Sequence, residues 1–232
     1  MADALAGCPR LAVTTSLAGR TMAPRRPRGK IRVGGFGGAT GLADYIRGHG
    51  IDMVIDATHP YAATISTHAA EACLVASRPL LRFERQAWQP RKGDRWIVVD
   101  SLSAAARIAP ELGRRAFLTI GAKELAAFAT STNVWFLVRL VEQPSDPVPL
   151  PNFELLLERG PFEMAAERQL MSQLRIDLLI AKNSGGEATY AKMAAARELG
   201  LPVLLLRRPR LPPAETAGTI ADAIAWAKEK AR

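Results

Sequence analysis

The chain has 232 residues, 48% of them hydrophobic, with a formal net charge of +9 and a pI near 10.1. This composition excludes an intrinsically disordered protein, and no apolar run approaches the roughly 20 residues that a membrane-spanning helix needs. The two cysteines form no CxxC pair and have no His-rich company, so we expect neither a metal site nor a disulfide framework. No secretory signal is visible, and we expect a cytoplasmic protein without a membrane partner.

The excess of basic residues favours a negatively charged partner, because it raises the concentration of anions around the protein. Nucleic acid is one candidate, yet the Lys and Arg residues are scattered over many loops, and no helix-turn-helix, zinc-finger or RNP pattern accompanies them. The densest basic run, residues 20–30, lies in a Pro- and Gly-rich loop that a solvated surface explains as well. A small polyanion fits the charge equally well, and we expect no nucleic-acid partner.

Short apolar strands alternate with helices from residue 11 onward. In the first half, strands are predicted over 11–16, 30–33, 51–56 and 79–83, and a helix over 62–76. In the second half, strands are predicted over 115–120, 134–141, 153–157, 177–181 and 202–206, and helices over 101–112, 123–129, 161–174, 187–199 and 214–230. This alternation indicates βαβ units with parallel strands, so the predicted fold class is α/β.

A boundary is predicted at residues 89–94, which combine Pro, Gly and charge without periodicity. It separates a first domain, residues 1–90, from a second, residues 91–232. The pattern fits two doubly wound sheets, or one long sheet divided by a cleft.

In open parallel sheets, ligands bind outside the carboxyl ends of the strands. The first loop in that position follows residues 11–16, where Thr15 and Ser16 precede Arg20. Hydroxyls with an Arg suit a ribose 2′-phosphate better than the acidic residue that selects NAD, so we expect a preference for NADPH over NADH. A polar strand end with a solvated Arg is the competing interpretation.

The second loop, residues 34–41, holds glycines around a single aromatic residue. It departs from the strict GxGxxG fingerprint, because Thr40 stands where a third glycine would follow Gly35 and Gly37. These two glycines still allow the backbone to approach a ligand closely, with Phe36 against a ring. A tight turn explains the composition about as well.

The third loop follows the strand at 51–56 and contains Thr58, His59 and Tyr61. All three offer hydrogen-bond donors beside a cofactor. Histidine side chains ordinarily titrate near neutral pH, so His59 is a candidate proton donor. A histidine satisfied within the fold is the alternative.

The fourth loop, residues 181–190, joins a strand to a helix and contains Lys182, Asn183 and Ser184. A lysine, hydroxyls and amides that converge on a helix N-terminus predict an anion site. The loop is not a Walker A motif, so ATP chemistry is disfavoured. Lys123 and Arg159 occupy similar but weaker positions after other strands.

Several motifs occur together in this chain: TSLAGR at residues 15–20, GGFGG at 34–38, IDATHPYA at 55–62, RGPF at 159–162, KNSGG at 182–186 and TYAK at 189–192. In type and order they resemble the precorrin-6A reductase family, over nearly the whole chain. The resemblance implies two Rossmann-like parallel-sheet domains with a cleft between them, NADPH as hydride donor and a polycarboxylate tetrapyrrole as substrate. It implies reduction of a ring double bond of precorrin-6A, giving precorrin-6B, in cobalamin biosynthesis.

The loops and the resemblance together define the expected site residues. Cofactor contacts are expected from Thr15, Ser16, Arg20, Gly35, Phe36, Gly37 and Thr58. Substrate carboxylates are expected to contact Lys123, Arg159, Lys182, Asn183 and Ser184. His59 or Tyr61 is the expected proton donor, with the substrate or water as the other source.

The sequence departs from the family at its start. Family members begin with a strand and a Gly-Gly-Thr-type phosphate loop before the first helix, whereas residues 1–7 read as the tail of that helix. We therefore expect the upstream DNA to encode roughly 15 to 20 further residues. Two alternatives stay open: a nucleotide-binding protein of the same fold without turnover, and a basic nucleic-acid binder.

Overall fold

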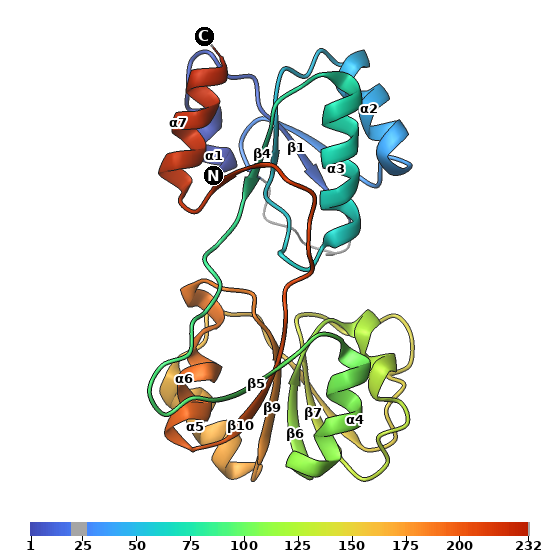
Figure 1. Ribbon diagram of the computed structural model, residues 1–232, viewed down its shortest axis with the longest axis vertical. Helices are drawn as coiled ribbons and strands as arrows, with labels where there is room; N and C mark the ends of the chain where they lie inside the picture. Colours follow the sequence, from blue (N-terminus) through green and yellow to red (C-terminus); the bar gives the residue numbers. More distant parts are fainter. Residues whose placement is uncertain (20–26, 232) are drawn as a thin grey trace. The chain divides into compact units, whose positions relative to one another are not determined.

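The computed structural model describes residues 1–19 and 27–231, and the chain forms two compact units (Figure 1). The first unit comprises Met1–Gln86 and Pro209–Arg232, and the second comprises Ala87–Arg208. The C-terminal segment, expected in the second domain, therefore belongs to the first unit. The reason is strand pairing, because β11 (Glu215–Ala217) pairs with β4 (Leu80–Phe83).

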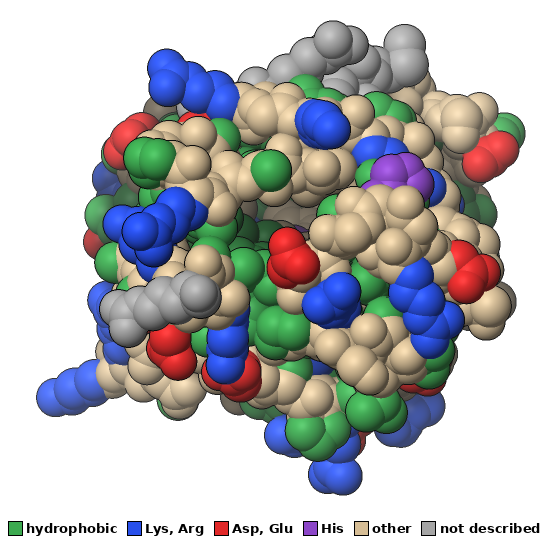
Figure 2. Space-filling model, turned by 90° about the horizontal axis from the view of Figure 1, so that it is seen from above, with side chains coloured by type: hydrophobic (Ala, Val, Ile, Leu, Met, Phe, Trp, Pro, Cys, Tyr) green, Lys and Arg blue, Asp and Glu red, His purple; other side chains and the backbone are tan. Residues whose placement is uncertain are grey.

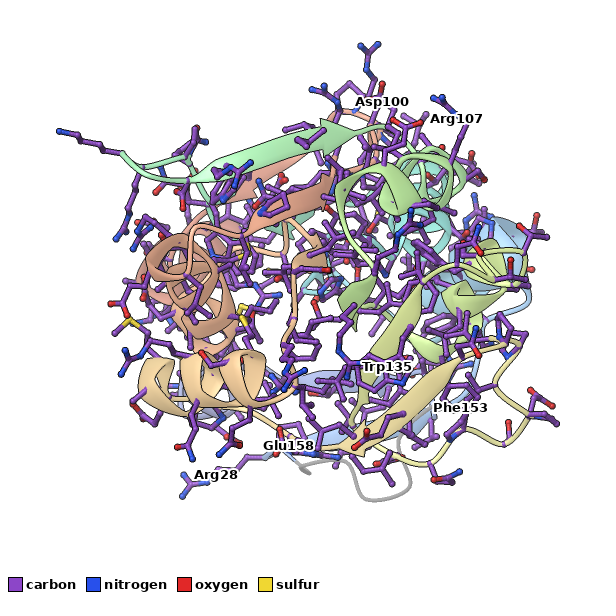
Figure 3. The ribbon with its side chains drawn as sticks, turned by 90° about the horizontal axis from the view of Figure 1, so that it is seen from below. Arg28, Asp100, Arg107, Trp135, Phe153 and Glu158 are labelled. Atoms are coloured by element: carbon purple, nitrogen blue, oxygen red, sulfur yellow. The ribbon has the colours of Figure 1, made fainter. Side chains whose placement is uncertain are left out.

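The second unit contains a six-stranded sheet in which all neighbouring strands are parallel. In sheet order the strands are β5 (Arg95–Val99), β10 (Pro202–Leu206), β9 (Leu178–Lys182), β6 (Arg115–Thr119), β7 (Trp135–Leu140) and β8 (Phe153–Leu157). Trp135 and Phe153 start the neighbouring strands β7 and β8, and Glu158 follows the end of β8 (Figure 3). Thr119 pairs with Ala181, which aligns the carboxyl ends of β6 and β9.

Helices cover both faces of this sheet (Figure 1). One face carries α4 (Leu102–Leu112) with the 3₁₀ segment η1 (Ala122–Phe128), and the other carries α5 (Met164–Gln173), the 3₁₀ turn η2 (Glu187–Thr189) and α6 (Ala191–Glu198). Strands buried on both faces read as continuous apolar runs, which explains why their sequence pattern is clear. On the α5 and α6 face, Phe117, Leu137 and Leu179 pack with Met171 and Met193. Full burial of each such side chain stabilises the fold by about 1.5–3 kcal/mol.

The first unit contains two smaller parallel sheets. β1 (Thr14–Leu17) pairs with β2 (Lys30–Val33), and β4 pairs with β3 (Val54–Asp56) on one side and with β11 on the other. Within the described residues, β1 and β3 belong to separate hydrogen-bonded sheets. The expected α/β class with parallel sheets is confirmed in both units.

Two pairs of helices pack on the first unit (Figure 1). The helices are α1 (Ala2–Ala6), α2 (Gly38–Gly48), α3 (Ala63–Ala76) and α7 (Ile220–Lys230). Leu5 of α1, Leu81 of β4 and Trp226 of α7 share one core cluster. Ile46 of α2 and Ala72 of α3 belong to another. Leu80 of β4 packs against this second cluster, so the neighbouring residues Leu80 and Leu81 face different cores, as the alternation of side chains along a strand requires.

Most predicted elements end within a few residues of the observed ones. No helix bounds were predicted for α2 (Gly38–Gly48), and three further regions differ. β5 was not predicted, because it directly follows the Pro/Gly-rich boundary. Three of its five residues are apolar but are only partly buried or are exposed. The helix predicted over 123–129 is the 3₁₀ segment η1. The helix predicted from residue 214 begins only at Ile220, because Glu215–Ala217 form β11 through pairing with a distant strand.

Candidate functional site

The sheet of the second unit has a topological switch point between β6 and β9. From β6 the chain continues outward to β7 and β8, whereas β9 leads to β10 on the opposite side. Ligands of open α/β sheets bind at such points, outside the carboxyl ends of the strands. The loops at residues 120–124 and 182–186 follow these two strands, and both contain residues expected from the sequence.

Lys182, at the end of β9, lies at this switch point. Its ammonium group donates to both carboxylate oxygens of Glu124, which stands 58 residues earlier in η1. The Glu124 carboxylate also accepts the backbone N–H of Gly121 at 2.9 Å. Lys123, next to it in η1, is exposed. Of the expected residues, Lys182 and Lys123 therefore flank the same switch point, and Glu124 joins them as a residue that sequence reasoning missed.

Asn183 and Ser184 hold the loop together in this structure. The Asn183 side-chain amide accepts from the backbone N–H of Trp88 at 2.8 Å and donates to its carbonyl at 3.1 Å. The Trp88 indole N–H in turn donates to the Gly186 carbonyl at 3.0 Å. Ser184 is buried, with its hydroxyl 3.4 Å from that of Thr189. These contacts position the loop against the segment before β5.

Arg159 lies two strands from the switch point, where it donates to Glu142 at 3.1 Å. Its side chain is more than half exposed. Beneath it, the buried Arg139 of β7 pairs with Glu158 at 3.2 Å and with Glu167 of α5 at 2.8 Å. Burial raises the pKa of Glu167, although Arg139 opposes that shift. Arg139 was not singled out from the sequence, since an Arg within an apolar strand carries no motif.

Lys192 is a buried lysine below the 182–190 loop. Its ammonium donates to the Thr189 carbonyl at 2.8 Å and lies 5.3 Å from the centre of a Trp88 ring. Burial lowers the pKa of Lys192 to about 8, with Glu167 opposing the shift. It belonged to a motif of the resemblance but received no role there.

In the first unit, Arg32 of β2 connects several residues expected at the cofactor. Its guanidinium donates to the Ser16 hydroxyl at 3.3 Å, to the Gly34 carbonyl at 2.7 Å and to the Gly35 carbonyl. It also stacks 3.7 Å from the centre of the Phe36 ring. Sequence reasoning missed Arg32 because its neighbours in the chain are Ile31 and Val33, and only pairing of β1 with β2 brings it beside Ser16.

The glycine loop after β2 leaves open space above its backbone. A Cβ added to Gly35 or to Gly37 would meet no atom within 4 Å. Gly37 also has a φ of +79°, which a side chain would strain, and it caps α2. A loop of this kind suits the close approach of a ligand such as a dinucleotide phosphate. Thr15 lies in β1 beside Ile31, and Arg20 falls outside the described residues.

Thr58, His59 and Tyr61 lie at the end of β3. The Thr58 hydroxyl donates to the buried Asp56 carboxylate at 2.7 Å, and that carboxylate lies 3.8 Å from the buried Arg82 guanidinium. His59 Nδ1 accepts the backbone N–H of Tyr61 at 3.3 Å, which leaves the proton of a neutral imidazole on Nε2. The Asp56–Arg82 pair was also missed, because the two residues become neighbours only through the register of β3 and β4.

Two hollows of the first unit lie near these groups. One, of about 340 Å³, is lined by Thr14, Lys30, Ile31, Arg32, Tyr45, His49 and Ile51, so Arg32 of β2 contacts both this hollow and the glycine loop. The other, of about 10 Å³, is lined in part by Thr58 and His59 and has room for about one water molecule.

Three further features concern the surface charge, the length of the helices and the grouping of His, Cys, Asp and Glu side chains. On the face shown in Figure 2, Lys and Arg side chains are spread out with acidic side chains between them. Among residues 1–19 and 27–231, no helix combines the length and apolar character needed to cross a bilayer. In the same residues, no three His, Cys, Asp or Glu side chains gather as a metal site would require.

Parallel sheets flanked by helices, with loops at the carboxyl ends of the strands, define the doubly wound class of α/β proteins. Within that class, the chain belongs to the family described as "Precorrin-6x reductase CbiJ/CobK", whose family model matches residues 1–228. The members are oxidoreductases of cobalamin biosynthesis, and the resemblance stated from the motifs is confirmed.

Individual relatives support the same conclusion. The chain is 50% identical over 227 residues to a precorrin-6A reductase of Rhodococcus erythropolis, covering 97% of this chain and 91% of that protein. It is 42% identical to one of Rhodobacter capsulatus, covering 91% and 84%. A solved structure described as CobK precorrin-6A reductase matches with a TM-score of 0.88 at 40% identity, over 94% of this chain and 86% of that one.

Proposed function

We propose that this protein catalyses the NADPH-dependent reduction of precorrin-6A to precorrin-6B in the cytoplasm. The observation that carries the proposal is the 50% identity, over 97% of the chain, to a protein named precorrin-6A reductase. Bound NADPH supplies the hydride that reduces one double bond of the macrocycle. The protein contributes binding, orientation and a proton.

The first unit is the proposed cofactor domain. Its glycine loop leaves open space at Gly35 and Gly37, and Arg32 holds that loop beside Ser16. A guanidinium next to a hydroxyl at the end of a strand suits a ribose phosphate. The remaining proposed cofactor residues are Thr15, Arg20, Phe36 and Thr58.

The second unit is the proposed substrate domain. The cations proposed to pair with substrate carboxylates are Lys182, Lys123 and Arg159. They lie at or just after the carboxyl ends of β9, β6 and β8. Asn183 and Ser184 support that edge by holding the loop against Trp88 and Thr189. His59, or Tyr61 beside it, is the proposed proton donor.

The substrate proposed is the metal-free macrocycle. Relatives named precorrin-6A reductase reach 50% and 42% identity, whereas a cobalt-precorrin-6A reductase of Priestia megaterium reaches 30% over 180 residues. Comparison of the turnover of precorrin-6A with that of its cobalt complex tests this choice, and faster turnover of the cobalt complex would contradict it.

The decisive measurement follows the loss of NADPH absorbance after precorrin-6A is added, with formation of precorrin-6B checked by mass spectrometry. We expect steady turnover with NADPH and a much lower kcat/KM with NADH. Tight NADPH binding without turnover would favour the alternative of a nucleotide-binding protein. A salt-sensitive gel shift on generic DNA would favour the nucleic-acid alternative.

A further inference from the structure

The Lys182–Glu124 pair at the switch point is assembled from two distant segments. Lys182 ends β9, and Glu124 lies in η1 after β6. The Lys182 side chain is 13% exposed and that of Glu124 is 33% exposed. The Glu124 side chain is therefore more exposed to solvent than the Lys182 side chain with which it pairs.

The partners of the Glu124 carboxylate are typical of an anion site. They are the Lys182 ammonium, from β9, and the backbone N–H of Gly121, which stands three residues before Glu124 and caps the start of η1. Charge-assisted hydrogen bonds from a cation and an amide hold carboxylates well. The same donors suit a carboxylate on a small molecule, because they contact only the two oxygens and leave the rest of the acid unspecified.

We propose that Lys182 and the Gly121 amide form a carboxylate-binding site that Glu124 fills in the ligand-free protein, and that a carboxylate of the substrate displaces Glu124. The proposal rests on the proposed function for the identity of the natural ligand. It deepens that function by making Glu124 a specificity-determining residue. If the substrate carried a neutral group in place of this carboxylate, Lys182 would stay paired with Glu124 and the group would not strengthen substrate binding.

Displacement is feasible because it exchanges one carboxylate for another. The donors keep a charged acceptor throughout, so no buried cation is left unpaired. The cost of desolvating Lys182 offsets much of its attraction to Glu124, which keeps the competition from Glu124 weak. While Glu124 occupies the site, the substrate cannot bind there. The apparent Kd for substrate is therefore the intrinsic Kd divided by the fraction of molecules in which Glu124 has left the site.

The first test uses propionate as the probe and needs no enzymatic activity. In ¹H–¹⁵N spectra of Glu124→Ala, we expect the Gly121 amide resonance to shift on titration with propionate. The wild type should need about five times more propionate for the same shift, and the double variant Glu124→Ala/Lys182→Ala should show none. Glu111→Ala, which removes an exposed carboxylate from α4 of the same unit, is the matched control and should behave as the wild type.

The second test is kinetic. With Glu124→Ala, the KM for precorrin-6A should fall about fivefold, which corresponds to about 1 kcal/mol, while kcat stays the same. Should Glu124→Ala not fold, Glu124→Gln keeps an acceptor for the Gly121 N–H and should change KM in the same direction. A raised KM in the folded variant would overturn the proposal, since Glu124 would then only orient Lys182.

The two tests separate this proposal from the proposed function. If precorrin-6A is not reduced but the propionate shift appears, the carboxylate site stands and the proposed function fails. If turnover is normal and the folded Glu124→Ala variant shows no shift with propionate, the carboxylate site is wrong and the proposed function stands.

Discussion

Burial changes the chemistry of two side chains in opposite ways. Burial and the nearby Asp56 raise the pKa of the Cys73 thiol to about 11, so little reactive thiolate exists at neutral pH. Cys73 is buried in a hydrophobic cluster of the first unit. Burial lowers the pKa of Lys192 to about 8, because the folded environment disfavours the charged form of the lysine.

The Lys192 shift predicts a pH-dependent stability. Below pH 8 the lysine is charged in both the folded and the unfolded state, and folding bears the full cost of burying that charge. Between pH 8 and the ordinary value of 10.5, the unfolded chain binds more protons than the folded one, so stability rises with pH. Relative to Lys192→Met, the wild type should therefore gain up to about 3 kcal/mol across this window.

Urea denaturation of the wild type and Lys192→Met at several pH values between 7 and 10.5 measures this gain. Lys228→Met, which removes an exposed lysine from α7, is the control, and its difference from the wild type should stay constant. A difference for Lys192→Met that does not change with pH would show that the lysine keeps its ordinary pKa.

At the scale of elements, α2 links the glycine loop to the core of the first unit. Its residue Ile46 is buried against α3, while its N-terminal turn packs directly on the loop backbone. A Cβ at Gly41 would stand 1.9 Å from the Phe36 carbonyl oxygen. A Cβ at Gly48, in the same helix, would meet no atom within 4 Å.

These two glycines form a matched pair for mutation. Gly41→Ala should lower the free energy of unfolding by about 2 kcal/mol or more and weaken NADPH binding, because the loop must move away from the new methyl group. Gly48→Ala should raise stability by about 0.5–1 kcal/mol, since alanine loses less backbone entropy in a helix. Urea denaturation and NADPH titration of both variants check this. Equal effects of the two substitutions would contradict the packing of α2 on the loop.

At the scale of the whole molecule, the two units differ in how the chain builds them. The second unit is one continuous segment, Ala87–Arg208, with its own six-stranded sheet. The first unit needs Pro209–Arg232 in addition to Met1–Gln86, because β11 and the Trp226 cluster complete it.

This difference predicts how fragments behave. A fragment of residues 87–208 should unfold in one cooperative urea transition, with native near-UV circular dichroism, because its core is complete. A fragment of residues 1–86 should lack such a transition, since Leu5 and Leu81 lose their contacts with α7. If the 87–208 fragment showed no cooperative transition, the second unit would depend on contacts outside itself.

Local sequence determined a large part of the elements and the location of both candidate sites. The strands at 30–33, 153–157 and 202–206 have the predicted ends, because short apolar runs bounded by polar or turn residues are a local signal. The glycine loop and Lys182 were also predicted, since their residue types follow directly after a strand. These features depend on neighbours along the chain, which a sequence displays.

Tertiary structure alone decided which side chains meet. β11 is a strand only because it pairs with β4, more than a hundred residues earlier. Arg32 reaches Ser16, Asp56 reaches Arg82, and Asn183 holds Trp88 through strand register and loop packing. Lys182 was expected to bind an anionic ligand, and in the structure it pairs with the Glu124 carboxylate. These side-chain contacts join residues 16 to 95 positions apart in the chain, so the local sequence does not predict them, and only the folded sheets and loops bring them together.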